Sequence, residues 1–266
     1  MRPRLVVVLW AMSLLLVAGC GTRPRTGPGT GPQPDTAAAP VPGPTVVGLG
    51  DSVMAGTSCG CEGIMVRYAE REEASTGRAP IVPVNLGADG ATTTTLVADL
   101  RTASVVGQVR RARVVAVIIG ANDLVPQLRR QEEVGCPRSC YAPAVAAMGR
   151  RFGTVLAAVQ AARGSRPGAV LVLDYWNVFP DGDQTRATQG RSVVAWARAV
   201  SRLANAAISA RSAAYGDRFV DLYQPMLADG DPTDLLAADG DHPNSRGVDL
   251  IVDRLVAATP HGVFDP

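Results

Sequence analysis

The sequence predicts an α/β fold in which a parallel five-stranded sheet is covered by helices on both faces, a three-layer α/β/α sandwich. Five short apolar runs, at 45–50, 81–86, 114–120, 169–174 and 219–222, have the character of strands buried on both faces. Helix-like stretches lie between them, and this strand–helix alternation implies right-handed crossovers and a parallel sheet. Ligands of such folds bind beyond the carboxyl ends of the strands, so we expect the functional residues in the loops that follow these runs.

The helices are predicted from apolar residues that recur every three or four positions. The pattern is clearest over 145–159 and over 248–256, close to the end of the chain. A charged run at 70–73 is interpreted as the solvent-facing side of the first helix after the first strand.

Residues 1–20 are predicted to be an export signal. Arg2 and Arg4 precede an apolar run over 5–18, which is shorter than the roughly 20 residues of a membrane-spanning helix. The run ends in Val-Ala-Gly-Cys at 17–20 and resembles the lipobox of bacterial lipoproteins, in which the cysteine is lipidated. We therefore expect Cys20 to anchor an exported protein to the outer face of the cytoplasmic membrane; the alternative is an ordinary cleaved signal.

A linker and one domain are predicted to follow. Residues 21–44 contain seven prolines and five glycines, a composition typical of a flexible spacer without a core. The remaining 222 residues, 45–266, suit one α/β domain, which we expect to be a monomer. This part carries 22 arginines and 23 acidic residues, a formal charge of −1, which gives no reason to expect nucleic-acid binding.

Four cysteines remain in the domain: Cys59, Cys61, Cys136 and Cys140. An even number in an exported protein predicts two disulfides. Three pairings are possible, and we expect bridges between the two loops, because Cys59 and Cys61 lie close together in the sequence. Free thiols and a four-cysteine zinc site are the competing interpretations.

Two predicted strands end in residues that suit acyl-transfer chemistry. The first ends in Gly50-Asp51-Ser52, which places a hydroxyl nucleophile just beyond a strand. The third ends in Gly120-Ala121-Asn122-Asp123, where the Asn122 amide can donate hydrogen bonds to an oxyanion. After the second strand, either Gly87 or Gly90 could offer a backbone N–H to the same oxyanion.

A base for Ser52 is predicted in the segment 239–244, just before the last helix. His242 is one of only two histidines, and Asp239 three residues earlier can accept its second ring N–H. Asp241 is the alternative partner, and Asn244 is a plausible helix cap. For His261, near the C-terminus, we expect no role.

Together these residues resemble the SGNH, or GDSL, hydrolase family, whose fold is flavodoxin-like. The resemblance covers 45 to about 258 and rests on Gly50-Asp51-Ser52 with Gly56, the stretch 85–92, Gly120-x-Asn122-Asp123 and Asp239-x-x-His242. It implies Ser52 as nucleophile, His242 as base and Asp239 as its orienting acid. It also implies an oxyanion hole formed by the Ser52 amide, the Gly90 amide and the Asn122 side chain, because the family spacing selects Gly90 over Gly87.

The resemblance implies a serine esterase that cleaves an acyl ester through an acyl-enzyme, without a metal or organic cofactor. The substrate would be a small-molecule or cell-envelope acyl ester. An acyltransferase with the same triad, and a binding lipoprotein on an inactive scaffold, are the alternatives.

Several other residues are interpreted as structural. Asp51 and Asp123 are expected to hold turns, and the acidic segment 229–241 is expected to be solvated because it lacks the spacing of a calcium loop. Tyr175, Trp176 and Trp196 are expected in the core or in a pocket wall.

Overall fold

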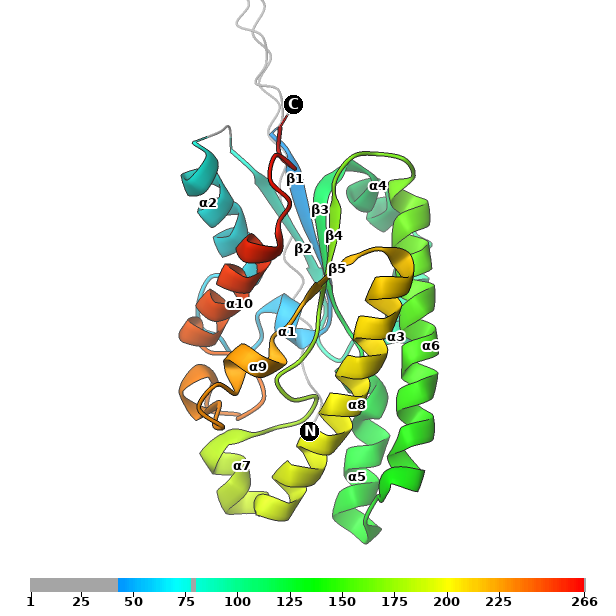
Figure 1. The fold of residues 1–266 in the computed structure, drawn as a ribbon, viewed down its shortest axis with the longest axis vertical. Helices are drawn as coiled ribbons and strands as arrows, with labels where there is room; N and C mark the ends of the chain where they lie inside the picture. The colour runs from blue at the N-terminus through cyan, green and yellow to red at the C-terminus, as the bar shows by residue number, and fades with distance from the viewer. Residues whose placement is uncertain (1–42, 78–79, 266) are drawn as a thin grey trace, which may run out of the picture. The chain divides into compact units, whose positions relative to one another are not determined.

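The computed structural model describes residues 43–77 and 80–265, and the predicted signal segment, Cys20 and most of the linker lie outside these residues. The five predicted strands form one parallel sheet in the order β2-β1-β3-β4-β5 (Figure 1). Each predicted run corresponds to one strand, with ends that differ by a few residues. The strands are β1 (Thr45–Gly50), β2 (Val82–Gly87), β3 (Ala112–Ile118), β4 (Ala169–Leu173) and β5 (Arg218–Val220).

Helices cover both faces of the sheet, as predicted (Figure 1). α2 packs against α10 on one face, while α6 packs against α4 and α8 on the other. Within the described residues the helical segments are α1 (Ser52–Ala55), α2 (Ile64–Thr76), α3 (Thr93–Asp99), α4 (Ala103–Arg111), η1 (Ala121–Leu124), α5 (Val125–Val134), α6 (Arg138–Arg163), α7 (Gly182–Gln189), α8 (Arg191–Tyr215), α9 (Tyr223–Met226), η2 (Thr233–Leu235) and α10 (Ser245–Ala258).

Burial along the strands follows their place in the sheet. β4 is buried along its whole length, and β1 and β3 are nearly so, because helices cover both of their faces and a strand flanks each edge. β2 lies at the edge and is more exposed. It contains Pro83, which has no N–H to give to a ladder and is tolerated at an edge.

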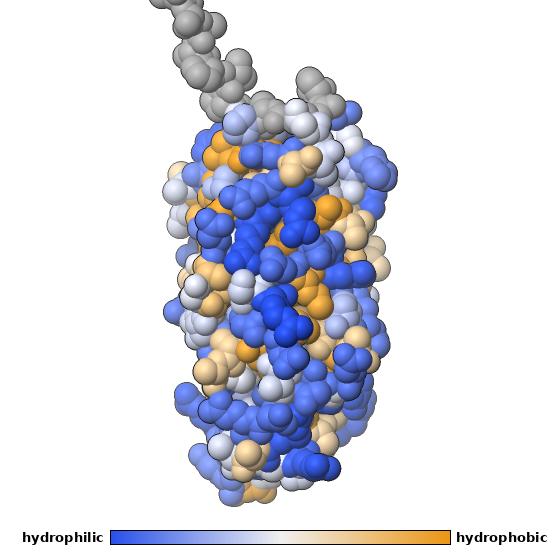
Figure 2. All heavy atoms as spheres, turned by 90° about the vertical axis from the view of Figure 1, so that its left-hand side faces the viewer, coloured by the Kyte–Doolittle hydropathy of each residue, from blue (hydrophilic) through white to orange (hydrophobic). Residues whose placement is uncertain are grey.

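The outer surface of the α2–α10 layer is mostly hydrophilic, with apolar side chains scattered over it (Figure 2). Ion pairs join the two helices along this surface: Arg67 pairs with Asp249 at 2.9 Å, and Arg71 pairs with Asp253. None of the helices in the described part of the chain has the length and apolar character needed to cross a bilayer.

Candidate active site

Ser52 lies at the carboxyl end of β1 as the first residue of α1. The buried Asp51 caps this helix, because its carboxylate accepts the backbone N–H of Val53 at 3.1 Å. The strand before it runs tightly beside β3: a Cβ on Gly50 would lie 2.1 Å from the carbonyl oxygen of Ile118. Glycine is therefore required here, and the predicted turn-holding role of Asp51 corresponds to this cap.

Each of the three predicted oxyanion donors has an N–H hydrogen that is not used in a hydrogen bond within the described residues. Within the described residues, the N–H groups of Ser52 and Gly90 have no hydrogen-bond partner, whereas the Gly87 N–H is taken by the Asn85 side chain at 2.9 Å. Gly90 has a φ of +70°, in the left-handed region that favours glycine. The Asn122 amide donates one hydrogen to the Ala91 carbonyl at 3.0 Å, which leaves its second hydrogen available.

Asp123, next to Asn122, ties η1 to the start of α3 and to α6. Its carboxylate accepts the Thr93 N–H at 2.8 Å and the Thr93 hydroxyl at 2.6 Å, and it pairs with Arg151 at 2.8 Å. These contacts hold η1, which carries Asn122, against the start of α3. Asp123 thus has the structural role that was expected of it.

His242 and Asp239 form a hydrogen-bonded pair, with 2.8 Å between the ring Nδ1 and the carboxylate Oδ2. The other carboxylate oxygen accepts the backbone N–H groups of Asp241 and His242 at 2.9 and 3.0 Å. Partial burial raises the pKa of Asp239, but hydrogen bonds from the Ser58 side chain, these two amides and the His242 ring outweigh it and hold the pKa well below its usual range. Asp239 is therefore a carboxylate, fixed to orient the ring.

Asp241, the alternative partner, makes no hydrogen bond to the ring within the described residues. Burial raises its pKa, as does the neighbouring charge of Asp239, while His242 lowers it. The loop is held from the other side by Asn244, which caps α10 by accepting the N–H groups of Arg246 and Gly247 at 2.9 and 3.1 Å.

A cavity of about 190 Å³ brings Ser52, Asn122 and His242 together. The described residues show no hydrogen bond between the Ser52 hydroxyl and the His242 ring, and catalytic pairs are often looser without substrate. Gly90 and Asp239 do not line the cavity, but each is linked to a residue that does. Asp239 binds the His242 ring, and Gly90 is next to Ala91, whose carbonyl accepts a hydrogen bond from Asn122. The apolar part of the wall includes Val125, Leu128, Trp176, Val178, Phe179 and Pro180, and its other polar residues are Asp51, Tyr175, Asn177 and Asp241.

Tyr175 has a contact that the sequence did not predict. Its hydroxyl donates a hydrogen bond to the Asp51 carboxylate, and both side chains are buried. Burial raises the pKa of Asp51 to about 7, and it does so even though the hydrogen bonds from Tyr175 and from the Val53 N–H lower it. Tyr175 follows β4 at the same edge of the sheet as Ser52, which is the one sequence signal that could have pointed to it.

Asp181 is a second residue at the site that the sequence did not predict. Its buried carboxylate accepts Arg198 at 2.7 and 3.0 Å and the Asn177 side chain at 3.1 Å. Its backbone N–H donates to the Gly240 carbonyl at 2.8 Å, in the loop of Asp239 and His242. Asp181 therefore connects a wall residue of the cavity with the histidine loop, and no motif in the sequence marks it.

The predicted pairing of the cysteines between loops is wrong. Cys59 bonds to Cys61 and Cys136 bonds to Cys140, so that each bridge lies within its own loop. Ser58 and Gly60 both have φ near +60°, and the chain turns so tightly that the Cα atoms of Cys59 and Cys61 are 5.1 Å apart. In the part of the chain that the structure describes, no group of three or more His, Cys, Asp or Glu residues is arranged to hold a metal ion.

The aromatic residues lie where they were expected. Tyr175 and Trp176 are buried and line the cavity. Trp196 stacks on Phe179 from behind the wall, with ring centroids 5.4 Å apart. Its indole N–H donates to the Cys136 carbonyl at 2.6 Å, which joins the second disulfide to the cavity wall.

Solved structures with the same fold include several hydrolases. A lipase from a goat rumen metagenome is 21% identical, with a TM-score of 0.65 over 81% of this chain and 97% of its own. Phospholipase A1 from Streptomyces albidoflavus NA297 is 20% identical, with a TM-score of 0.57 over 82% and 100%. An acetylxylan esterase from Geobacillus stearothermophilus, solved as a catalytic mutant, is 16% identical, with a TM-score of 0.57 over 81% and 94%.

The sequence matches no curated protein. The profile of the GDSL-like Lipase/Acylhydrolase family, however, matches residues 49–250, a range that includes Ser52, Asn122 and His242. This match and the observed fold agree with the resemblance seen in the sequence motifs. The chain therefore belongs to the GDSL-like lipase/acylhydrolase family of hydrolases.

Proposed function

We propose that this protein is a serine esterase that cleaves an acyl ester through a covalent acyl-enzyme. The observation that carries the proposal is the convergence of Ser52, Asn122 and His242 on one cavity, with the His242 ring hydrogen-bonded to Asp239. A nucleophile, a base, an orienting carboxylate and an oxyanion donor are the groups that acyl transfer to water requires.

In the first half of the reaction, Ser52 Oγ attacks the ester carbonyl while His242 Nε2 takes the hydroxyl proton. Asp239, held as a carboxylate, accepts the Nδ1–H and stabilises the imidazolium that forms. The tetrahedral oxyanion accepts hydrogen bonds from the Ser52 and Gly90 amides and from the free hydrogen of the Asn122 side chain. His242 then returns the proton to the leaving alcohol, and the ester carbonyl stays bonded to Ser52.

In the second half, water attacks the acyl-enzyme and His242 acts as its base. The apolar wall of the cavity receives the acyl group. A volume of about 190 Å³ lies below the roughly 300–1,000 Å³ typical of drug-sized ligand sites, so short acyl groups are the proposed substrates. Among the structural neighbours, one is an acetylxylan esterase, which supports an acyl group of this size.

The proposed location is the outer face of the cytoplasmic membrane, with Cys20 lipidated. The support is the arginine-led apolar run and the Val-Ala-Gly-Cys sequence at 17–20. Cys20→Ser should abolish incorporation of labelled palmitate into the protein and release it from the membrane fraction. Unchanged labelling of the variant would contradict the assignment.

The catalytic assignment is tested by hydrolysis of 4-nitrophenyl butyrate. Ser52→Ala and His242→Ala should each lower kcat by roughly 10³-fold or more. A fluorophosphonate probe should label the wild type covalently and leave Ser52→Ala unlabelled. His261→Ala is the matched control, because no role is expected for that histidine. Near-normal hydrolysis by either active-site variant would refute the proposal.

A further inference from the structure

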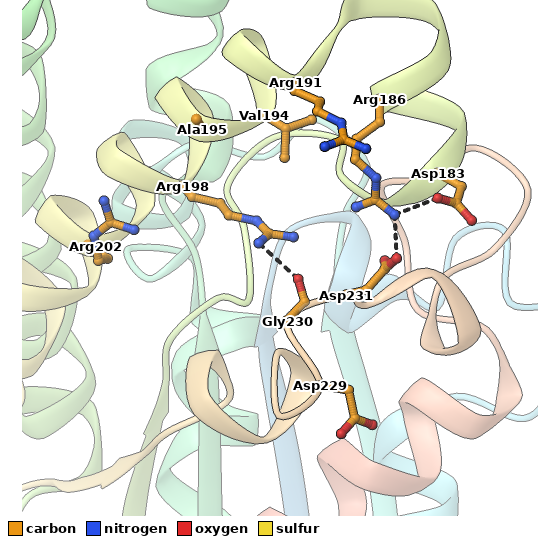
Figure 3. A pocket seen from close by; sticks show the side chains of 10 residues that line it. All are labelled: Asp183, Arg186, Arg191, Val194, Ala195, Arg198, Arg202, Asp229, Gly230 and Asp231. Carbon is orange, nitrogen blue, oxygen red and sulfur yellow. Dashed lines mark hydrogen bonds and ion pairs between the residues drawn. The ribbon is translucent and has the colours of Figure 1, made fainter.

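A second and larger cavity, of about 660 Å³, lies between α7, the first half of α8 and the segment 229–231 (Figure 3). Its volume is within the range of ligand sites. Four arginines line it: Arg186 on α7 and Arg191, Arg198 and Arg202 on α8. We call it the arginine pocket. None of its side chains takes part in the chemistry at Ser52.

Two of these arginines are neutralised by the protein itself. Arg186 pairs with Asp183 at 2.6 Å and with Asp231. Arg198 pairs with the buried Asp181 and donates to the Gly230 carbonyl at 3.0 Å, a contact visible in Figure 3. These two guanidinium groups hold the pocket walls together and have little charge left for a ligand.

The other two arginines keep their charge available. Within the described residues, Arg191 has no hydrogen bond or ion pair, and Arg202 donates only to the Tyr223 hydroxyl, at 3.1 Å. Both side chains are exposed. They lie eleven residues apart on one helix, which corresponds to a rise of about 16 Å. Figure 3 shows their two guanidinium groups apart, with that of Arg198 between them, so the arrangement suits a ligand with several anionic groups along its length.

The opposite side of the pocket offers a hydrogen-bond acceptor. Asp229 lines the side of the pocket across from the arginines of α8, and its exposed carboxylate, which has no partner among the described residues, points away from them at the rim (Figure 3). A ligand whose only polar groups are anionic, such as a polyphosphate, would be repelled by it. A sugar chain with carboxylates satisfies both sides, because its carboxylates accept from arginine and its hydroxyl groups donate to aspartate.

We propose that the arginine pocket binds an acidic oligosaccharide, with Arg191 and Arg202 on its carboxylates and Asp229 on its hydroxyl groups. The arginine pocket and the cavity at Ser52 are lined by residues that are only three positions apart in the sequence. Pro180 lines the cavity at Ser52, and Asp183 lines the arginine pocket. Three residues span at most about 11 Å. The acyl ester hydrolysed at Ser52 would then be an O-acyl group on an acidic polysaccharide, and this second step rests on the proposed function.

The binding step is tested by titration calorimetry with a trimer of glucuronic acid, which contains no ester and needs no catalysis. The form in which all three carboxyl groups are methyl esters is the neutral comparison, because it keeps the sugar hydroxyl groups and loses the charge. The esterified trimer should bind at least about tenfold more weakly, and the double variant Arg191→Gln/Arg202→Gln should weaken binding of the acid trimer by a similar factor. Arg254→Gln, an exposed arginine on α10, is the matched control and should bind as the wild type does.

Asp229→Ala distinguishes a sugar site from a general anion site. It should weaken binding of the glucuronic acid trimer about threefold, whereas it should strengthen binding of tripolyphosphate by removing a negative charge. The proposal is overturned if the trimer does not bind, if both trimers bind equally, if the double variant binds like the wild type, or if Asp229→Ala strengthens binding of the trimer. Hydrolysis of 4-nitrophenyl butyrate in the same samples reports on the proposed esterase separately.

Discussion

Tyr175 donates its hydroxyl hydrogen to Asp51, the residue directly before Ser52, across the two buried strand ends of β4 and β1. Asp51 in turn caps α1, so the nucleophile is positioned by a carboxyl group that binds Tyr175, from the end of a strand two places away in the sheet. The same carboxyl group faces Asp241 and His242 in the loop before α10, and both contribute to its electrostatic surroundings.

The raised pKa of Asp51, about 7 against 3.8 ordinarily, makes stability depend on pH. Between about pH 4 and 7 the folded protein keeps the Asp51 proton and the unfolded chain does not, so raising the pH disfavours the folded state. Asp51→Asn cannot ionise, and its free energy of unfolding relative to the wild type should rise by about 3 kcal/mol between pH 4.5 and 8. Urea unfolding at both pH values measures this.

Asp174 is also buried with its pKa raised to about 7, mainly by burial, so the wild type loses stability over this range for more than one reason. For this reason the quantity to compare is the difference between variant and wild type. An equal difference at the two pH values would show that Asp51 ionises normally in the folded protein.

The two aspartates of the histidine loop should differ in their effect on catalysis. Asp239→Asn should lower kcat by about 10²–10⁴-fold, because an amide cannot hold the imidazolium as the carboxylate does. Asp241→Asn should change kcat by less than about tenfold, since Asp241 makes no hydrogen bond to the ring within the described residues. Steady-state hydrolysis of 4-nitrophenyl butyrate checks both, and equal effects would mean that the partner is misassigned.

Asn122 should act on the transition state rather than on substrate binding. Asn122→Ala removes one oxyanion donor and should lower kcat by about 10²–10³-fold with little change in KM. Its bond to the Ala91 carbonyl is also lost, so thermal unfolding of the variant is the control for local disorder. A rise in KM at unchanged kcat would place Asn122 in ground-state binding instead.

Leu128, half-buried on α5, should limit the length of the acyl group. Leu128→Ala enlarges the apolar cavity and should raise the ratio of kcat/KM for hexanoyl over acetyl esters by about tenfold. Leu128→Met, which keeps the volume, should leave that ratio near the wild-type value. The same ratio in all three proteins would show that the acyl group lies elsewhere.

The Cys136–Cys140 bridge should contribute to stability through its short loop. Replacing both cysteines with serine should lower the free energy of unfolding by about 2 kcal/mol, from the loop-closure entropy of a bridge four residues apart. Thermal unfolding under non-reducing conditions measures the loss. A variant as stable as the wild type would show that α6 and the Trp196 contact hold this loop without the bridge.

The strands could be predicted because a strand that is buried on both faces appears in the sequence as a run of apolar residues. β1, β3 and β4 are mostly apolar, and the ends of β1 and β3 placed Ser52 and Asn122 at one edge of the sheet. The histidine pair was predictable for a related reason, because Asp239 and His242 are three residues apart and meet within one turn.

Contacts between segments that are far apart in the sequence could not be predicted from a pattern of residues. The distance between two loops is set by packing, and for this reason the cysteine pairing was mispredicted. Asp181 is 17 residues from Arg198 and 59 from Gly240, yet it binds both. The arginine pocket likewise depends on α8 lying across from residues 229–231, which nothing in the order of the residues indicates.

The direction of β1 has a consequence for access to the protein. The strand runs from Thr45 to Gly50, about 20 Å, so the described domain joins the preceding segment at one rim and presents Ser52 at the other. A molecule that approaches Ser52 therefore arrives at the rim opposite the start of the described domain.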